Sequence, residues 1–146
     1  MANEIRVKAR STITAQTNSS ALDTDYDPTS ASYTGGTPTV IDNTYDAGTE
    51  NALGAHYLTL ELNVTDAPAT AGTAEVWYST SEDGTNYTLP KYSHTVGNDI
   101  GTTDNVYYDA GLFELTSQFT KLYVHAQGYD IDACTLLATP KLVEAV

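Results

Sequence analysis

Residues 55–64 alternate strictly between apolar and polar side chains. Every second residue there is aliphatic: Leu58, Leu60, Leu62 and Val64. A β-strand points successive side chains to opposite faces, so this pattern predicts a strand that is buried on one face. Residues 73–81 and 121–127 alternate in the same way, whereas no stretch of ten or more residues fits a helical pattern. The chain is therefore predicted to be all-β.

Turn signals separate these strands at short intervals. A Pro- and Gly-containing turn spans residues 65–72, and Glu82-Asp83-Gly84 forms another. A bend at Gly111 is predicted to separate two short strands, residues 106–108 and 112–115. One or two closing strands are predicted in residues 134–146. This spacing predicts a single antiparallel β-sandwich, jelly-roll or immunoglobulin-like, and no fixed repeat suggests a propeller or solenoid.

Within one domain, three regions differ in composition. Residues 1–16 form an N-terminal strand or arm, residues 17–54 a long polar loop segment with short strands, and residues 55–146 the sandwich core. The middle region contains six acidic residues and no basic one. Its tyrosines Tyr26, Tyr33 and Tyr45 are candidates for contact with a neighbouring subunit.

Charge excludes several classes of partner. Six basic residues against nineteen acidic ones give a net charge of −13. This balance argues against nucleic acid, whose phosphates need Lys and Arg, and against an anionic membrane surface. Cys134 is the single cysteine, so no intrachain disulfide can form. Together with the lack of an apolar run of signal-peptide length, this predicts a protein made in a reducing compartment.

The N-terminal strand differs from the rest of the chain in charge. Three of the six basic residues lie within the first ten positions and alternate with apolar ones: Ile5, Arg6, Val7, Lys8 and Arg10 carry the pattern. One interpretation is a first strand whose basic face meets carboxylates of its own domain. The other is an arm that reaches an acidic neighbour, and we expect this strand to be partly intermolecular.

No motif predicts catalysis, a cofactor or a metal. The run from Asp23 to Asp27 begins like a calcium loop, but Pro28 and Thr34 occupy positions that need Gly and Glu. His56, His94 and His125 lack metal-ligand spacing, and no nucleophile elbow occurs. The segment from Ser81 to Tyr87 is similar to an Asp-box turn and is predicted to be structural. We therefore expect a protein that is not an enzyme.

The order of elements resembles a known group of proteins. An N-terminal strand leads to a Thr/Ser-rich stretch, an L-x-L-x-L strand, a V-W-Y-S-T-S-x-D-G-x-x-Y hairpin (residues 76–87), a K-L-Y-V strand and a closing strand. This resembles small β-sandwich virion proteins of tailed bacteriophages, especially capsid decoration (cement) proteins. The resemblance implies a structural protein on the capsid exterior, made in the host bacterial cytoplasm. It would bind the major capsid protein and clamp neighbouring capsomers, with a homotrimer favoured.

Two alternatives stay open. The chain could be a head-fibre or tail structural protein of the same sandwich type. It could also be a carbohydrate-binding module, because Tyr57, Trp77 and Tyr123 could align on the outward face of adjacent strands and stack on sugar rings.

Overall fold

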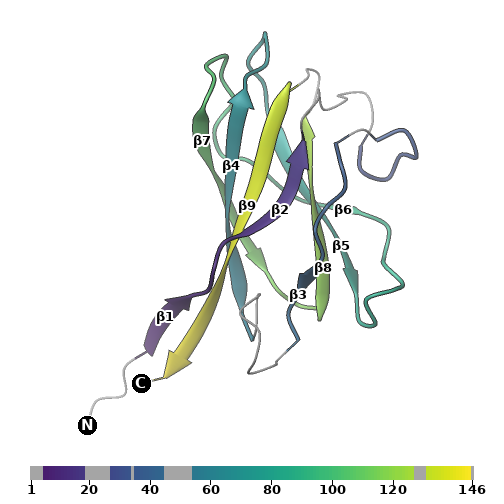
Figure 1. The fold of residues 1–146 in the computed structure, drawn as a ribbon, viewed down its shortest axis with the longest axis vertical. Helices are drawn as coiled ribbons and strands as arrows, with labels where there is room; N and C mark the ends of the chain where they lie inside the picture. The colour runs from purple at the N-terminus through teal and green to yellow at the C-terminus, as the bar shows by residue number, and fades with distance from the viewer. Residues whose placement is uncertain (1–4, 19–26, 34, 45–53, 127–130, 146) are drawn as a thin grey trace.

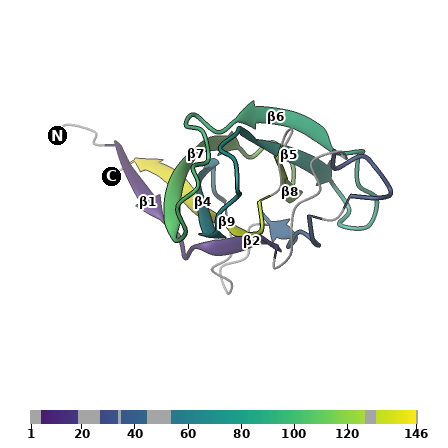
Figure 2. The ribbon, with the colours of Figure 1, turned by 90° about the horizontal axis from the view of Figure 1, so that it is seen from above.

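The computed structural model describes residues 5–18, 27–33, 35–44, 54–126 and 131–145. These residues contain strands and no helix, and the strands form two antiparallel sheets packed face to face (Figures 1 and 2), so the prediction of an all-β sandwich is confirmed. The strands are β1 (Ile5–Ala9), β2 (Ile13–Asn18), β3 (Ile41–Asp42), β4 (Tyr57–Asp66), β5 (Ala74–Ser81), β6 (Lys91–Thr95), β7 (Val106–Glu114), β8 (Phe119–Ala126) and β9 (Ala133–Ala145).

The first sheet is organised around the long strand β9. One edge of β9 pairs with β4, which pairs in turn with β7, and the other edge pairs with β1 and β2. The second sheet has the order β3-β8-β5-β6. The alternating aliphatic residues of β4 lie in the core between the sheets, as predicted: Leu58, Leu60, Leu62 and Val64 are all buried.

The closing segment forms one strand, β9, and the proline within it lies opposite the break between β1 and β2. Pro140 lies within β9, and its carbonyl accepts a hydrogen bond from Arg10 N at 2.9 Å. In an antiparallel ladder the N–H and C=O of one residue point to the same side. The missing N–H of Pro140 therefore faces residues 10–12, where β1 ends before β2 begins.

β7 corrects the prediction of two short pieces around Gly111. It is one continuous strand that contains a β-bulge, because its register with β4 shifts between Thr59 and Glu61. Gly111 has a φ of 82°, and its N–H donates to Asp109 Oδ1 at 2.9 Å. The extra residue in β7 moves the side chains that follow it to the opposite face of the sheet, so Leu112 is 63% exposed while Phe113 is buried.

One side of the sandwich is closed by a buried glutamine. Gln16 on β2 accepts a hydrogen bond from Val124 N of β8 at 2.7 Å, and its amide donates to Gly36 O at 3.3 Å and Tyr33 Oη at 3.2 Å. Tyr33 in turn donates to Val124 O. The side chains of Gln16 and Tyr33 thus satisfy both backbone groups of one residue at the edge of β8 and link the two sheets.

The opposite side of the sandwich is formed by the edges of β6 and β7. His94 on β6 joins these edges, because its Nε2–H donates to Ala110 O at 2.6 Å while its Nδ1 accepts from Ser93. Gly111 packs against the same imidazole, and a Cβ there would lie 3.0 Å from His94 Nε2.

Candidate interaction surfaces

The N-terminal strand and the end of β9 form a two-stranded ribbon that projects from the sandwich (Figure 1). β4 begins at Tyr57, which pairs with Lys141, so residues 142–145 of β9 continue past β4 with β1 as their partner. His56 joins the ribbon to the sandwich: its N–H donates to Lys141 O at 2.8 Å, and its Nδ1 accepts from Val143 N at 3.1 Å.

The described side chains of the ribbon are largely exposed. Val7 is 55% exposed and stands across from Val143, which is also exposed. Lys8 is exposed and stands across from Leu142, while Arg6 stands across from Glu144 in the register. The backbone of β1 therefore pairs within its own chain, but no strand in the described ranges pairs with its outer edge. An intermolecular role for that edge remains a prediction.

Of the three tyrosines of the polar segment, Tyr33 is the one that lies within the described residues. Tyr26 and Tyr45 lie outside the described residues. Tyr33 is turned inward: its hydroxyl joins the Gln16 network, and its ring meets Tyr123 edge-on with centroids 6.1 Å apart. Burial raises the pKa of Tyr33 above its ordinary value. Its contacts therefore hold residues 27–33 against the protein's own sandwich.

The predicted alignment of three aromatic rings is wrong. Trp77 and Tyr123 are register partners in the second sheet, whereas Tyr57 lies on β4 in the first sheet. Tyr92 and His125 each approach Trp77 edge-on, with centroids 6.2 Å away. Both Trp77 and Tyr123 are only partly exposed. A flat stacking platform for sugar rings built from these three residues is therefore not present.

The acidic and histidine features lie apart from one another. Asp27 accepts hydrogen bonds from the N–H and hydroxyl of Thr29, and the hydroxyl bond is the main reason that its pKa is lowered. Asp23 and Asp25 lie outside the described residues. His125 Nε2 lies 3.8 Å from Glu75 Oε1. The other two histidines have different contacts, since His56 binds the ribbon and His94 binds β7. Within the described ranges no group of three or more His, Cys, Asp or Glu could hold a metal ion.

The segment from Ser81 to Tyr87 forms a tight, internally bonded turn. Asp83 Oδ1 accepts from the N–H groups of Thr85 and Asn86, both at 2.8 Å, and the Asn86 bonds are the main cause of the lowered pKa of Asp83. Gly84, with a φ of 75°, donates to Ser81 Oγ at 3.0 Å. The carboxylate is occupied by the backbone of its own turn, as the structural interpretation predicts.

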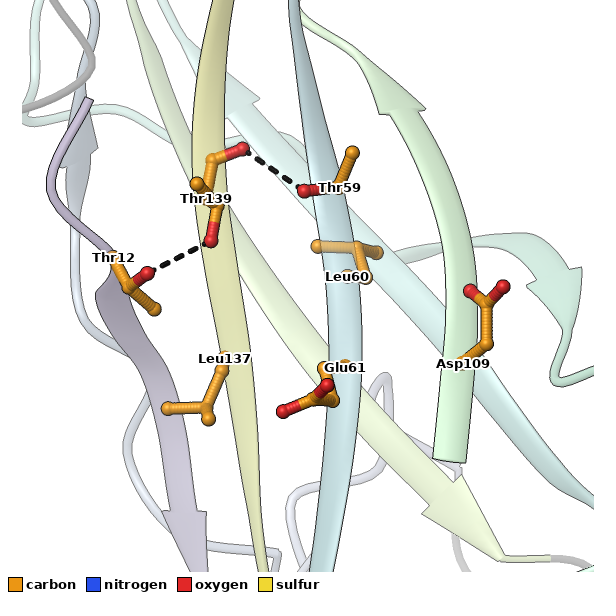
Figure 3. Close-up of a pocket in the computed structure, with 7 residues that line it drawn as sticks. All are labelled: Thr12, Thr59, Leu60, Glu61, Asp109, Leu137 and Thr139. Carbon is orange, nitrogen blue, oxygen red and sulfur yellow. Dashed lines mark hydrogen bonds between the residues drawn. The ribbon is translucent and has the colours of Figure 1, made fainter. Parts of the chain in front are cut away.

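A hollow on the outer face of the first sheet is a feature that the sequence interpretation missed. It has a volume of about 510 Å³ and is lined by Thr12, Thr59, Leu60, Glu61, Asp109, Leu137 and Thr139 (Figure 3). We call it the first-sheet hollow. Its threonines are linked, since the hydroxyls of Thr12 and Thr139 lie 2.8 Å apart and Thr59 donates to Thr139 O at 3.5 Å. Its two carboxylates come from residues that are far apart in the sequence, so only the strand register reveals it.

The chain matches no protein-family model, no curated protein and no solved structure. Among its described residues there is no helix with the length and apolarity needed to cross a bilayer.

Proposed function

We propose that this protein is a non-enzymatic structural protein of a tailed-phage virion. It binds the outside of the assembled capsid lattice through the major capsid protein and stabilises contacts between capsomers. The observation that carries the proposal is the projecting ribbon of β1 and β9, which extends beyond the sandwich and leaves the outer edge of β1 open among the described residues.

The ribbon has the properties that lattice binding requires. Its open edge offers backbone N–H and C=O groups for strand addition, and its exposed side chains Val7 and Lys8 offer apolar and charged contact. Such a contact is small. A protein that uses several small contacts at once binds an assembled lattice far more tightly than isolated subunits, because the second contact is intramolecular. The acidic remainder of the surface keeps densely decorated particles soluble.

The test is co-sedimentation with empty, expanded particles assembled from the major capsid protein of the same genome. We expect saturable binding of the full chain at a stoichiometry set by lattice symmetry, and at least ten-fold weaker binding after deletion of residues 1–10. None of the deleted residues whose side chains the structure describes, 6–10, belongs to the hydrophobic core, so the shortened chain should still unfold cooperatively.

Each other outcome counts against part of this proposal. Absence of co-sedimentation of the full chain would overturn it. Binding that is equally strong without residues 1–10 would remove the ribbon from the contact. If labelled protein is found on tails or fibres of complete virions, the head-fibre or tail alternative replaces capsid decoration.

A further inference from the structure

Two acidic residues of the first-sheet hollow are register partners on neighbouring strands. Glu61 of β4 and Asp109 of β7 are register partners, and both side chains are exposed on the outer face of the sheet (Figure 3). Directly opposed side chains in an antiparallel sheet have Cβ atoms about 4.5–5.5 Å apart, and like charges in this position are destabilising. Within the described ranges, no basic side chain forms an ion pair with either carboxylate. A cation from outside the chain would relieve this repulsion.

The remaining lining fits a peptide better than a bare ion. Leu137 is the register partner of Glu61 on its other side, so one carboxylate lies between an apolar side chain and a second carboxylate. Threonine hydroxyls border the same surface. A long basic side chain, with an aliphatic stem and a charged end, would match this combination.

The ribbon carries that combination. Lys8 is exposed on β1 and combines an aliphatic stem with a charged end, and Arg10 follows the end of the strand. The side chain of Val7 points to the opposite face of the ribbon. Because the chain has a net charge of −13, most pairs of its surfaces repel each other at low salt. The N-terminal stretch holds half of the basic residues and is therefore the part of the chain best suited to approach an acidic surface of another copy.

We propose that the ribbon of one copy docks in the first-sheet hollow of a second copy. Lys8 and Arg10 neutralise the carboxylates of Glu61 and Asp109, and the aliphatic stem of the Lys8 side chain packs toward Leu137. This inference concerns copies of the chain alone and does not rest on binding to a capsid.

The contact uses two different surfaces, which determines the kind of assembly. Such a head-to-tail interface forms a closed ring if the rotation between copies closes, as in a trimer, and an open chain otherwise. The symmetric alternative, antiparallel pairing of two β1 edges around Val7, would place Lys8 beside Arg6 of the other copy. Repulsion between these like charges opposes that arrangement.

The test is a charge exchange followed by sedimentation velocity in low salt. We expect the full wild-type chain to associate in a concentration-dependent way, and to associate less in 0.5 M salt because exposed ion pairs are screened. K8E/R10E and E61K/D109K should each weaken association at least ten-fold, since each gives the two surfaces the same sign of charge. The four substitutions combined in one chain should restore it, because its ribbon and its hollow then carry opposite charges again.

A matched control separates this contact from the effect of net charge. K8E/R10E changes the net charge to −13 − 4 = −17, and adding E61K/D109K returns it to −13. Adding E82K/D99K, at two exposed acidic positions outside the hollow, returns the same net charge and should not restore association. Thermal unfolding verifies that each variant is folded.

The result can overturn the inference in three ways. A wild-type chain that is monomeric at every concentration in low salt would do so, as would double variants that associate like wild type, or a folded quadruple variant that stays monomeric. Capsid co-sedimentation is measured separately, so self-association without capsid binding would refute only the proposed function, and the reverse result would refute only this inference.

Discussion

Replacement of Gln16 by leucine should destabilise the protein strongly although no aliphatic core residue changes. Gln16 is 2% exposed, and its side chain is the hydrogen-bond acceptor for Val124 N. In the Q16L variant this N–H stays buried without a partner, at a cost of about 1–3 kcal/mol. Loss of the amide donors to Gly36 O and Tyr33 Oη adds about 1 kcal/mol. We therefore expect a total of about 2–4 kcal/mol.

That loss is large compared with the total stability of a domain, which is about 5–15 kcal/mol. For a chain of this length it corresponds to a fall in Tm of roughly 5–15 °C. The assay is urea unfolding followed by circular dichroism, with Thr17→Val as a control at an exposed position on the same strand, expected within about 0.5 kcal/mol of wild type. A Q16L variant as stable as this control would refute the view that the glutamine closes the sandwich.

A double-mutant cycle with Tyr33→Phe tests the coupling of the network. Gln16 and Tyr33 both serve the backbone of Val124, one at its N–H and one at its carbonyl, and they also contact each other. Residues that share one network show interaction energies of about 0.5–3 kcal/mol. The combined variant should therefore lose less stability than the sum of the two single losses. Strict additivity would mean that the two side chains act independently.

Two further predictions concern single positions in the first sheet. Gly111→Ala should cost about 1–3 kcal/mol of unfolding free energy, because its φ of 82° and the approach of a Cβ to the His94 imidazole both disfavour a side chain. Gly97→Ala is the control and should be nearly neutral, since a Cβ there meets open space. Equal stability of the two variants in urea would contradict this. Burial raises the pKa of the Cys134 thiol from 9.0 to about 12. The unfolded chain therefore loses this proton at lower pH than the folded chain, and the contribution of Cys134 to the free energy of unfolding declines as pH rises from 9.0 towards 12. The native thiol should accordingly resist Ellman's reagent at pH 8 and react after unfolding; rapid labelling of the native protein would show that Cys134 is accessible.

The sequence predicts those parts of the fold that depend on local periodicity. Alternation over β4 identifies which of its faces is buried, because a strand places neighbouring side chains on opposite sides whatever its partners are. The same argument places Val76 and Val124 in the core. The isolated glycine at position 111 predicts an irregularity, but periodicity alone does not distinguish a bend from a bulge inside one strand.

The sequence does not predict which strands become neighbours. Tyr57 and Trp77 lie on consecutive long strands, and consecutive strands often pair, but β4 and β5 belong to different sheets. The pairing of Glu61 with Asp109 depends in addition on the bulge in β7, which determines the register there. The sequence does not predict the burial of Gln16 for another reason. A polar residue in an alternating strand is expected to be exposed, and the burial of Gln16 follows from the packing of β2 beside β8.

The sandwich protects its strand edges in different ways, and this difference supports the ribbon as the place where a partner binds. An exposed edge can pair with any other strand, so edges are usually covered, shortened, bulged or charged. Residues 35–42 cover the edge of β2, β6 has only five residues, and β7 is interrupted by its bulge. In the described part of the chain the edge of β1 has neither cover nor bulge, and it carries basic residues instead. Basic residues on an edge oppose pairing with an identical edge and still permit an acidic partner. The charge exchange between Lys8, Arg10 and the first-sheet hollow tests this selectivity directly.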